Sequence, residues 1–168
     1  GNEDSVTNKT KTMRRPIKHT HTILPDEKYD SELLSRFINT LMWSGKKSLA
    51  RTIVYDALDE IKNRDGAADP LAVFEMAIQN VSPSIETRSK RVGGANYQIP
   101  IEVRLERRRA LAFRWILKAA RSTNGKAMYK KLADELIAAS KNEGTAIKKR
   151  EDVQKQAEAN RAFAHLAW

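Results

Sequence analysis

Basic side chains gather between positions 90 and 109, in a pattern suited to holding phosphates. Six cations stand there against two acids; the cations are Lys90, Arg91, Arg104, Arg107, Arg108 and Arg109. Three consecutive arginines at the start of a predicted helix oppose the helix dipole, so helix stability does not explain them. Asn96, Tyr97 and Gln98 add amide groups and an aromatic face that suit bases or 2′-hydroxyls. We interpret the stretch as an RNA-gripping segment; the alternative is a solvated basic surface.

A second basic stretch, Gly45-Lys46-Lys47-Ser48, resembles the end of a phosphate-binding P-loop. Thr40 stands where that loop needs its earlier glycine, and the segment follows a predicted helix rather than a strand. Nucleotide binding is therefore disfavoured. Two lysines at a helix N-terminus remain a reasonable place to hold one RNA phosphate.

The last predicted helix carries Lys148, Lys149 and Arg150, followed by two acids. Mixed charges of this kind are usually a solvated helix face, so RNA contact and plain solvation both stay open. Arg161 and His165 lie four residues apart, which predicts that they share a face of the same helix.

Catalytic interpretations lack support. The chain has no cysteine, which excludes disulfides, cysteine-ligated zinc and thiol catalysis. Of its three histidines, His19 and His21 lie in the N-terminal segment, so a histidine metal site or general base is not expected. Neighbouring carboxylates such as Asp134 and Glu135 point in different directions on a helix. We predict neither an enzyme nor a cofactor.

The overall charge favours a polyanionic partner. The chain has 31 Lys and Arg against 21 Asp and Glu, a net charge of +10 and a pI near 9.9, which attracts nucleic acid. No apolar run approaches the ~18 residues of a membrane span, so no membrane partner is expected. Residues 5–25 hold five Lys or Arg and no acid. We expect residues 1–24 to form a flexible basic arm, although a remnant of organellar import would look similar.

Helical periodicity in the remainder predicts the elements that position these groups. We expect a single domain over residues 25–168, mainly α, with six helices and a protruding two-stranded β-ribbon between the third and fourth. Ser48 is the predicted cap of the second helix, with Leu49 among its inward residues, and Asp69-Pro70 begins the third. The fourth helix should cover about 106–121, the fifth lie between 125 and 142, and the sixth cover about 145–164.

The ribbon is predicted by a change of period. Tyr97, Ile99, Ile101 and Val103 alternate with polar residues and Pro100, as in a strand, and residues 85–92 are a basic strand candidate. Gly93-Gly94 between them suits the positive φ angles of a tight hairpin turn. Pro100 lacks an N–H, which predicts an isolated ribbon at about 84–104 rather than part of a larger sheet.

Several collinear blocks of the sequence carry a family resemblance. They include RFINTLMWSGKKS (36–48), PLAVFEMAIQNVSP (70–83), RVGGANYQIPIEVR (91–104), RWILKAAR (114–121) and TAIKKREDVQKQAEANRAFAHLAW (145–168). From about Met13 to Trp168 the chain resembles the bacterial-type small-subunit ribosomal protein seven family. The resemblance implies a structural protein that binds the 3′ major domain of small-subunit rRNA and helps to nucleate assembly of the subunit head. It places the ribbon near the exit site for tRNA and mRNA, beside neighbouring head and platform ribosomal proteins.

The resemblance also implies RNA contacts by particular residues. These are Arg14 and Arg15 in the arm, Lys46 and Lys47 in the GKKS turn, Arg88, Lys90 and Arg91 on the ribbon, and the Lys126–Met128 segment. We add three basic residues of the matching chain to the expected set, namely Lys18, Arg36 and Arg114.

Several features depart from the family pattern. Leu105 and Glu106 replace a proline-containing link after the ribbon, and Ser122, Thr123 and Asn124 stand where a more basic stretch is common. The longer N-terminal segment leans slightly toward an organellar ribosome, with a bacterial one still open. Two other classes also remain open on the residues alone: a helical module whose ribbon binds an acidic protein, and a helical DNA-binding protein.

Overall fold

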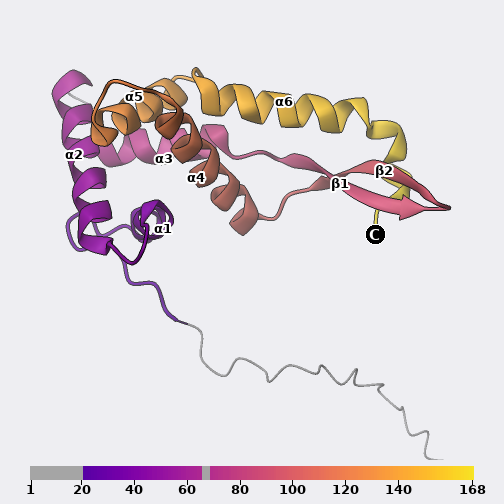
Figure 1. Cartoon of the computed structure of the whole chain (residues 1–168), viewed down its shortest axis with the longest axis horizontal. Helices are drawn as coiled ribbons and strands as arrows, with labels where there is room; N and C mark the ends of the chain where they lie inside the picture. The colour runs from indigo at the N-terminus through magenta and orange to yellow at the C-terminus, as the bar shows by residue number, and fades with distance from the viewer. Residues whose placement is uncertain (1–20, 66–68) are drawn as a thin grey trace, which may run out of the picture.

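The computed structural model describes residues 21–65 and 69–168, which form a helical body with a long ribbon extending from it (Figure 1). The elements in chain order are α1 (Glu32–Leu41), α2 (Lys47–Asp65), α3 (Pro70–Val81), β1 (Ile85–Val92), β2 (Ala95–Glu102), α4 (Leu105–Ser122), α5 (Met128–Ser140), α6 (Thr145–Ala159) and a terminal 3₁₀ helix η1 (Arg161–Leu166). The mainly α class and the ribbon between α3 and α4 are confirmed. No helix in the described part of the chain combines the length and apolarity needed to cross a bilayer.

The body is held together by apolar side chains at helical spacing. Phe37 of α1 lies at its centre, with ring centroids 5.1 Å from Phe74 of α3 and 5.3 Å from Phe113 of α4. Leu132 and Leu136 of α5 are fully buried against them. Aromatic pairs at these separations add about 0.5–1.5 kcal/mol to the free energy gained by burial. The core therefore fixes α1 and α4 relative to each other.

The start of α2 differs from the prediction. The helix begins at Lys47, and the N–H of Ala50 donates to the carbonyl of Lys46 at 3.2 Å, so Ser48 lies inside the first turn and does not cap it. Leu49 was predicted to face inward but is 56% exposed, while Ala50 and Val54 are buried. Helical periodicity puts Leu49 at the edge of the apolar stripe of α2. The packing of α2 against its neighbours leaves this edge exposed to solvent.

The ribbon is confirmed as an isolated antiparallel pair. Its register runs from Ile85 opposite Glu102 to Val92 opposite Ala95. Gly93 and Gly94 make the two-residue turn with φ angles of +58° and +85°, a conformation that costs other residues strain. Ile99, the fully buried residue of β2, is covered where the C-terminal elements pack on the ribbon.

The C-terminal segment corrects the predicted sixth helix. α6 ends at Ala159, where the N–H and the side-chain amide of Asn160 both donate to the carbonyl of Gln156. The chain then turns into η1, which packs on β2, and ends beside the ribbon (Figure 1). Arg161 and His165 lie on this 3₁₀ helix, whose faces repeat every three residues, so they do not share a face as predicted.

Candidate nucleic-acid interface

A basic groove runs between α1 and α4. Its volume is about 880 Å³, and it receives side chains from one stripe of α4: Glu106, Arg109, Ala110, Phe113, Arg114, Leu117, Lys118 and Arg121. Successive members lie three or four residues apart, so they follow one face of the helix. α1 contributes Arg36, Asn39 and Thr40 from the opposite side. Phe113 and Leu117 are buried, which makes the floor of the groove part of the core.

The charge of this groove is strongly unbalanced. Five cationic side chains line it, from Arg36, Arg109, Arg114, Lys118 and Arg121, against the single carboxylate of Glu106. Arg36 pairs with Glu32 at 2.7 Å, one turn away on α1. Among the ion pairs formed within residues 21–65 and 69–168, none involves Arg109, Arg114 or Lys118. A concave surface of one charge sign concentrates the field and attracts a polyanion.

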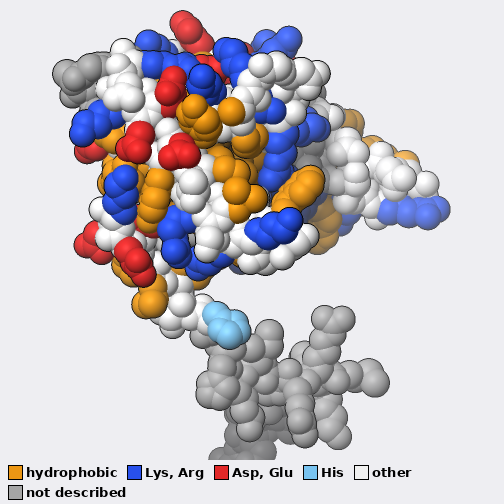
Figure 2. All heavy atoms as spheres, turned by 60° about the vertical axis from the view of Figure 1, so that its left-hand side comes forward, with side chains coloured by type: hydrophobic (Ala, Val, Ile, Leu, Met, Phe, Trp, Pro, Cys, Tyr) orange, Lys and Arg blue, Asp and Glu red, His pale blue; other side chains and the backbone are white. Residues whose placement is uncertain are grey.

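The outer half of the ribbon presents a second basic surface. Arg88, Arg91 and Asn96 are exposed there, as the sequence led us to expect of groups that meet RNA. Figure 2 shows this arm projecting from the body with Lys or Arg side chains toward its outer end. The same view shows basic side chains grouped beside exposed hydrophobic ones on the body.

Two predicted RNA-binding residues of the ribbon contact the C-terminal segment. The ammonium of Lys90 donates to the carbonyl of Leu166 at 2.9 Å and lies 5.1 Å from the ring centroid of Trp168. The ring of Tyr97 packs against Phe163, with 5.3 Å between centroids. Both side chains are half-buried, and their contacts help to hold η1 and the chain end on the ribbon.

The three consecutive arginines at the start of α4 point to three different places. Arg107 makes a two-point contact with Glu86 of β1, from Nε to Oε1 at 2.6 Å and from Nη2 to Oε2 at 3.0 Å. This hydrogen-bonded pairing raises the pKa of Arg107 further above its ordinary value. Arg108 donates to the carbonyl of Val103 at 2.8 Å. Arg109 alone of the three enters the basic groove.

The GKKS turn lies between α1 and α2, with Lys46 and Lys47 exposed. Gly45 has φ +70°, and the N–H of Lys46 donates to the carbonyl of Trp43 at 3.0 Å, which makes the turn tight. Both ammonium groups are therefore available at the end of α1, close in sequence to the residues that line the basic groove.

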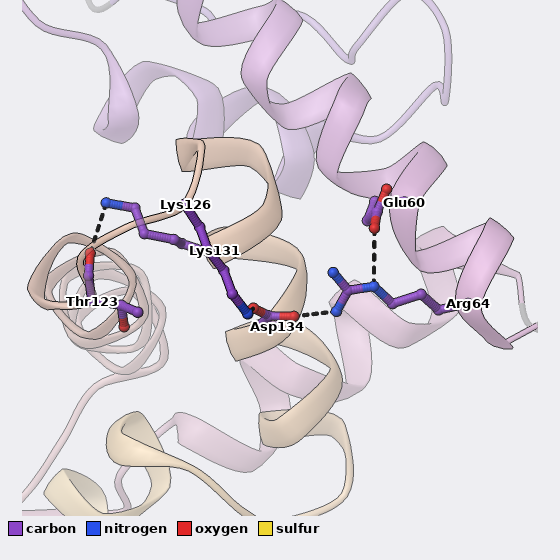
Figure 3. Close-up of polar contacts among 6 residues, drawn as sticks. All are labelled: Glu60, Arg64, Thr123, Lys126, Lys131 and Asp134. Atoms are coloured by element: carbon purple, nitrogen blue, oxygen red, sulfur yellow. Dashed lines mark hydrogen bonds and ion pairs between the residues drawn. The ribbon is translucent and has the colours of Figure 1, made fainter.

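Lys126 and Met128, predicted as contacts before the fifth helix, lie in a structural network. Lys126 donates to Asp134 at 3.1 Å, and Arg64 at the end of α2 pairs with the same carboxylate (Figure 3). Burial alone would raise the pKa of Asp134, but the hydrogen bonds from Arg64 and Lys126 more than offset it and lower the pKa. Met128 is half-buried against the core. The network ties the start of α5 to α2.

The remaining expected contacts fall into two groups. On α6, Lys148 and Lys149 are exposed, whereas Arg150 is half-buried and donates to the carbonyl of Asn80. The arm residues Arg14, Arg15 and Lys18 lie outside the described residues, as does most of the predicted arm over residues 1–24.

The sequence did not lead us to predict three residues at or near the basic groove. Lys118 and Arg121 line the groove, and Trp43 lies beside it. Lys118 and Arg121 follow Arg114 by four and seven residues, so their spacing on a predicted helix signals the basic stripe. Trp43 lies just beyond the end of α1 and is 71% exposed. A tryptophan close to the two lysines of the GKKS turn is a pattern from which its place at a binding surface could have been predicted.

Comparison with known proteins identifies the family of the chain. Residues 13–161 match the family described as Ribosomal protein S7p/S5e. The chain is 52% identical over 155 residues to the small ribosomal subunit protein uS7 of Methylocella silvestris, covering 92% of this chain and 99% of that protein. It is 55% identical to the protein of the same name from Vibrio vulnificus, with the same coverage.

The chain belongs to the ribosomal protein S7p/S5e family. The resemblance inferred from the sequence blocks is thereby confirmed, and this family member is a structural protein of the small ribosomal subunit rather than an enzyme. A dedicated DNA-binding protein and a protein-interaction module outside the ribosome are no longer needed to explain the basic surface. Both of these relatives are bacterial, so they give no support to an organellar source for the chain.

Proposed function

We propose that this family member binds the 3′ major domain of small-subunit rRNA, helps to nucleate assembly of the subunit head, and holds its ribbon near the exit site for tRNA and mRNA. The observation that carries the proposal is the basic groove between α1 and α4. It begins at the foot of the ribbon, at Glu106 and Arg109, and follows α4 to Arg121. An RNA backbone lying in this groove would be led directly toward the ribbon.

The mechanism is electrostatic and depends on a rigid frame. Lys and Arg in the groove neutralise phosphates and release condensed counterions, which makes affinity fall steeply with salt. Because Phe113 and Leu117 under the groove are buried, the cations on either side of them keep fixed positions along α4. Phosphate contacts of this kind set position and orientation on a folded RNA. Neighbouring head and platform ribosomal proteins would then join the same scaffold.

Filter binding to a transcribed 3′ major domain fragment at several salt concentrations tests the groove. The triple variant Arg109→Gln, Arg114→Gln and Lys118→Gln removes three phosphate contacts, and the slope of log affinity against log salt should fall by about 2–3. A matched control neutralises three exposed lysines outside the groove: Lys62, Lys141 and Lys155. An equal loss in both variants would mean that net charge, not the groove, drives binding.

The position of the ribbon needs a separate test. A photo-crosslinker placed at the exposed Arg91 in assembled subunits should react with exit-site tRNA or with mRNA. Crosslinks only to rRNA or to neighbouring proteins would remove the exit-site part of the proposal and leave the rRNA-binding part standing.

A further inference from the structure

An apolar groove lies beside the basic one, where α1 ends and α2 begins. It encloses about 450 Å³ and is lined mainly by Met42, Trp43, Leu49, Ile53, Arg121 and Met128. Trp43 is 71% exposed and Leu49 56% exposed. Single exposed apolar residues are common, but two large ones that meet in one hollow mark a binding surface more often than chance.

The tryptophan is held as a platform. The guanidinium carbon of Arg121 lies 5.0 Å from the centroid of the Trp43 ring, within the range of a cation–π contact. Arg121 also donates to the carbonyl of Leu41 at 3.3 Å, so this cation is itself fixed to the end of α1. The indole is therefore supported from one side, while most of its surface stays open to solvent.

The two grooves adjoin at one residue. Arg121 lines both of them, and Lys46 of the GKKS turn borders the apolar one. A ligand that fits must combine a flat apolar group with negative charge next to it. An unpaired nucleotide has this composition, because its base stacks on aromatic rings while its phosphates meet Lys and Arg. An apolar peptide would fill the hollow but gain nothing from the basic rim.

We propose that Trp43 stacks on an unpaired nucleobase of the RNA whose backbone lies in the α1–α4 groove, with Arg121 and Lys46 holding the flanking phosphates. The inference rests on the proposed function and adds a base-contacting subsite to it. Stacking is insensitive to salt, whereas phosphate contacts are not. The subsite and the groove can therefore be separated experimentally.

The test compares Trp43→Ala and Trp43→Phe in the full chain, bound to the 3′ major domain fragment at several salt concentrations. Trp43→Ala should weaken binding about tenfold, as expected for one lost base–aromatic stack, with the salt slope unchanged. Trp43→Phe should recover most of the affinity because it keeps an aromatic face. Met76→Ala, which shortens an exposed side chain of α3 that lines neither groove, is the control and should bind as the unaltered chain does.

The outcomes separate the two proposals. If the unaltered chain binds with a steep salt slope and Trp43→Ala binds equally well, the stacking subsite is refuted and the groove stands. If the unaltered chain shows no salt-dependent binding, the proposed function fails first. If Trp43→Ala keeps its affinity for RNA but enters subunits poorly, a neighbouring protein occupies the hollow and the inference is overturned. Equal unfolding midpoints of the variants establish that folding is not the cause.

Discussion

The contact between Glu86 and Arg107 joins the ribbon to the body, and Arg107→Met should weaken that joint. The carboxylate of Glu86 has a side chain only 11% exposed, on β1 near the base of the ribbon, whereas the side chain of Arg107 is 44% exposed. The substitution leaves a largely buried carboxylate without its two-point partner. Phosphate binding by Arg107 stays a prediction, and its contact with Glu86 adds a structural role whose loss should lower stability.

The loss of unfolding free energy expected for Arg107→Met lies between two limits. Removing one partner of a fully buried pair costs about 3–5 kcal/mol, and an exposed pair contributes about 0–1 kcal/mol. With one side chain largely buried and the other nearly half exposed, we expect Arg107→Met to lower the free energy of unfolding by about 2 kcal/mol. For a chain of this size the midpoint temperature should fall by about 4–8 °C. Glu86→Gln removes the charge but keeps the shape, and its cost should be about 1 kcal/mol.

Urea unfolding followed by circular dichroism measures these values, and the double variant closes the thermodynamic cycle. The double variant should be more stable than the sum of the single losses predicts, with a coupling energy of about 1 kcal/mol. Arg88→Met, an exposed arginine on the same strand, is the control and should change stability by less than about 0.5 kcal/mol. Additive losses, or an effect of Arg107→Met no larger than that of Arg88→Met, would refute the reasoning.

Three further substitutions test other parts of the fold. Asp134→Asn should cost about 0.5–1 kcal/mol at neutral pH, since the carboxylate is about a third exposed. Because folding lowers the pKa of Asp134, its contribution to stability is present above the ordinary value of 3.8 and is lost as the pH falls through the lower folded value. In urea unfolding, a stability difference between the variant and the unaltered chain that does not narrow as the pH falls below 3.8 would contradict this. Burial and the 2.6 Å hydrogen bond to Asp26 raise the pKa of Tyr55 to about 12, so its contribution is present below pH 10 and lost toward pH 12. Tyr55→Phe should cost about 1–2 kcal/mol and remove a component that titrates near pH 12 from an absorbance titration. A loss of absorbance change near pH 10 instead would count against the contact. Replacing Gly93 and Gly94 by alanine should cost about 1–2 kcal/mol at each positive φ and speed amide exchange along the ribbon, and exchange as slow as before would rule out the strain argument.

Local patterns predicted much of the fold because they depend on neighbouring residues. Asp69 and Pro70 begin α3 as expected, and the side chain of Asp69 accepts from the N–H of Leu71 at 3.2 Å. The Gly93-Gly94 turn and the isolated ribbon also follow from short-range stereochemistry. Leu49 shows the limit of this approach, since periodicity could not tell which side of the apolar stripe its neighbours would cover.

The candidate site was predicted less completely than the fold. The charge cluster between residues 90 and 109 pointed to Arg109, and the family resemblance led us to add Arg114; both line the basic groove. The same cluster also contained Lys90 and Arg107, which the folded chain pairs with Leu166 and Glu86. Each of these partners lies more than twenty residues away in the sequence, so no local pattern identifies it.

The sequence by itself determined that this chain is basic, mainly helical, ribbon-bearing and a member of a ribosomal protein family. These properties reside in composition, periodicity and collinear motifs, which need no knowledge of contacts. Only the tertiary structure decided which cations remain available to RNA. It brings the basic stripe of α4 and the side chains of α1 together in one groove, with Trp43 beside it. It also pairs other cations, such as Lys90 and Arg107, with acceptors within the protein. The physical reason is that a guanidinium or ammonium binds the nearest acceptor, and folding decides which acceptor is nearest.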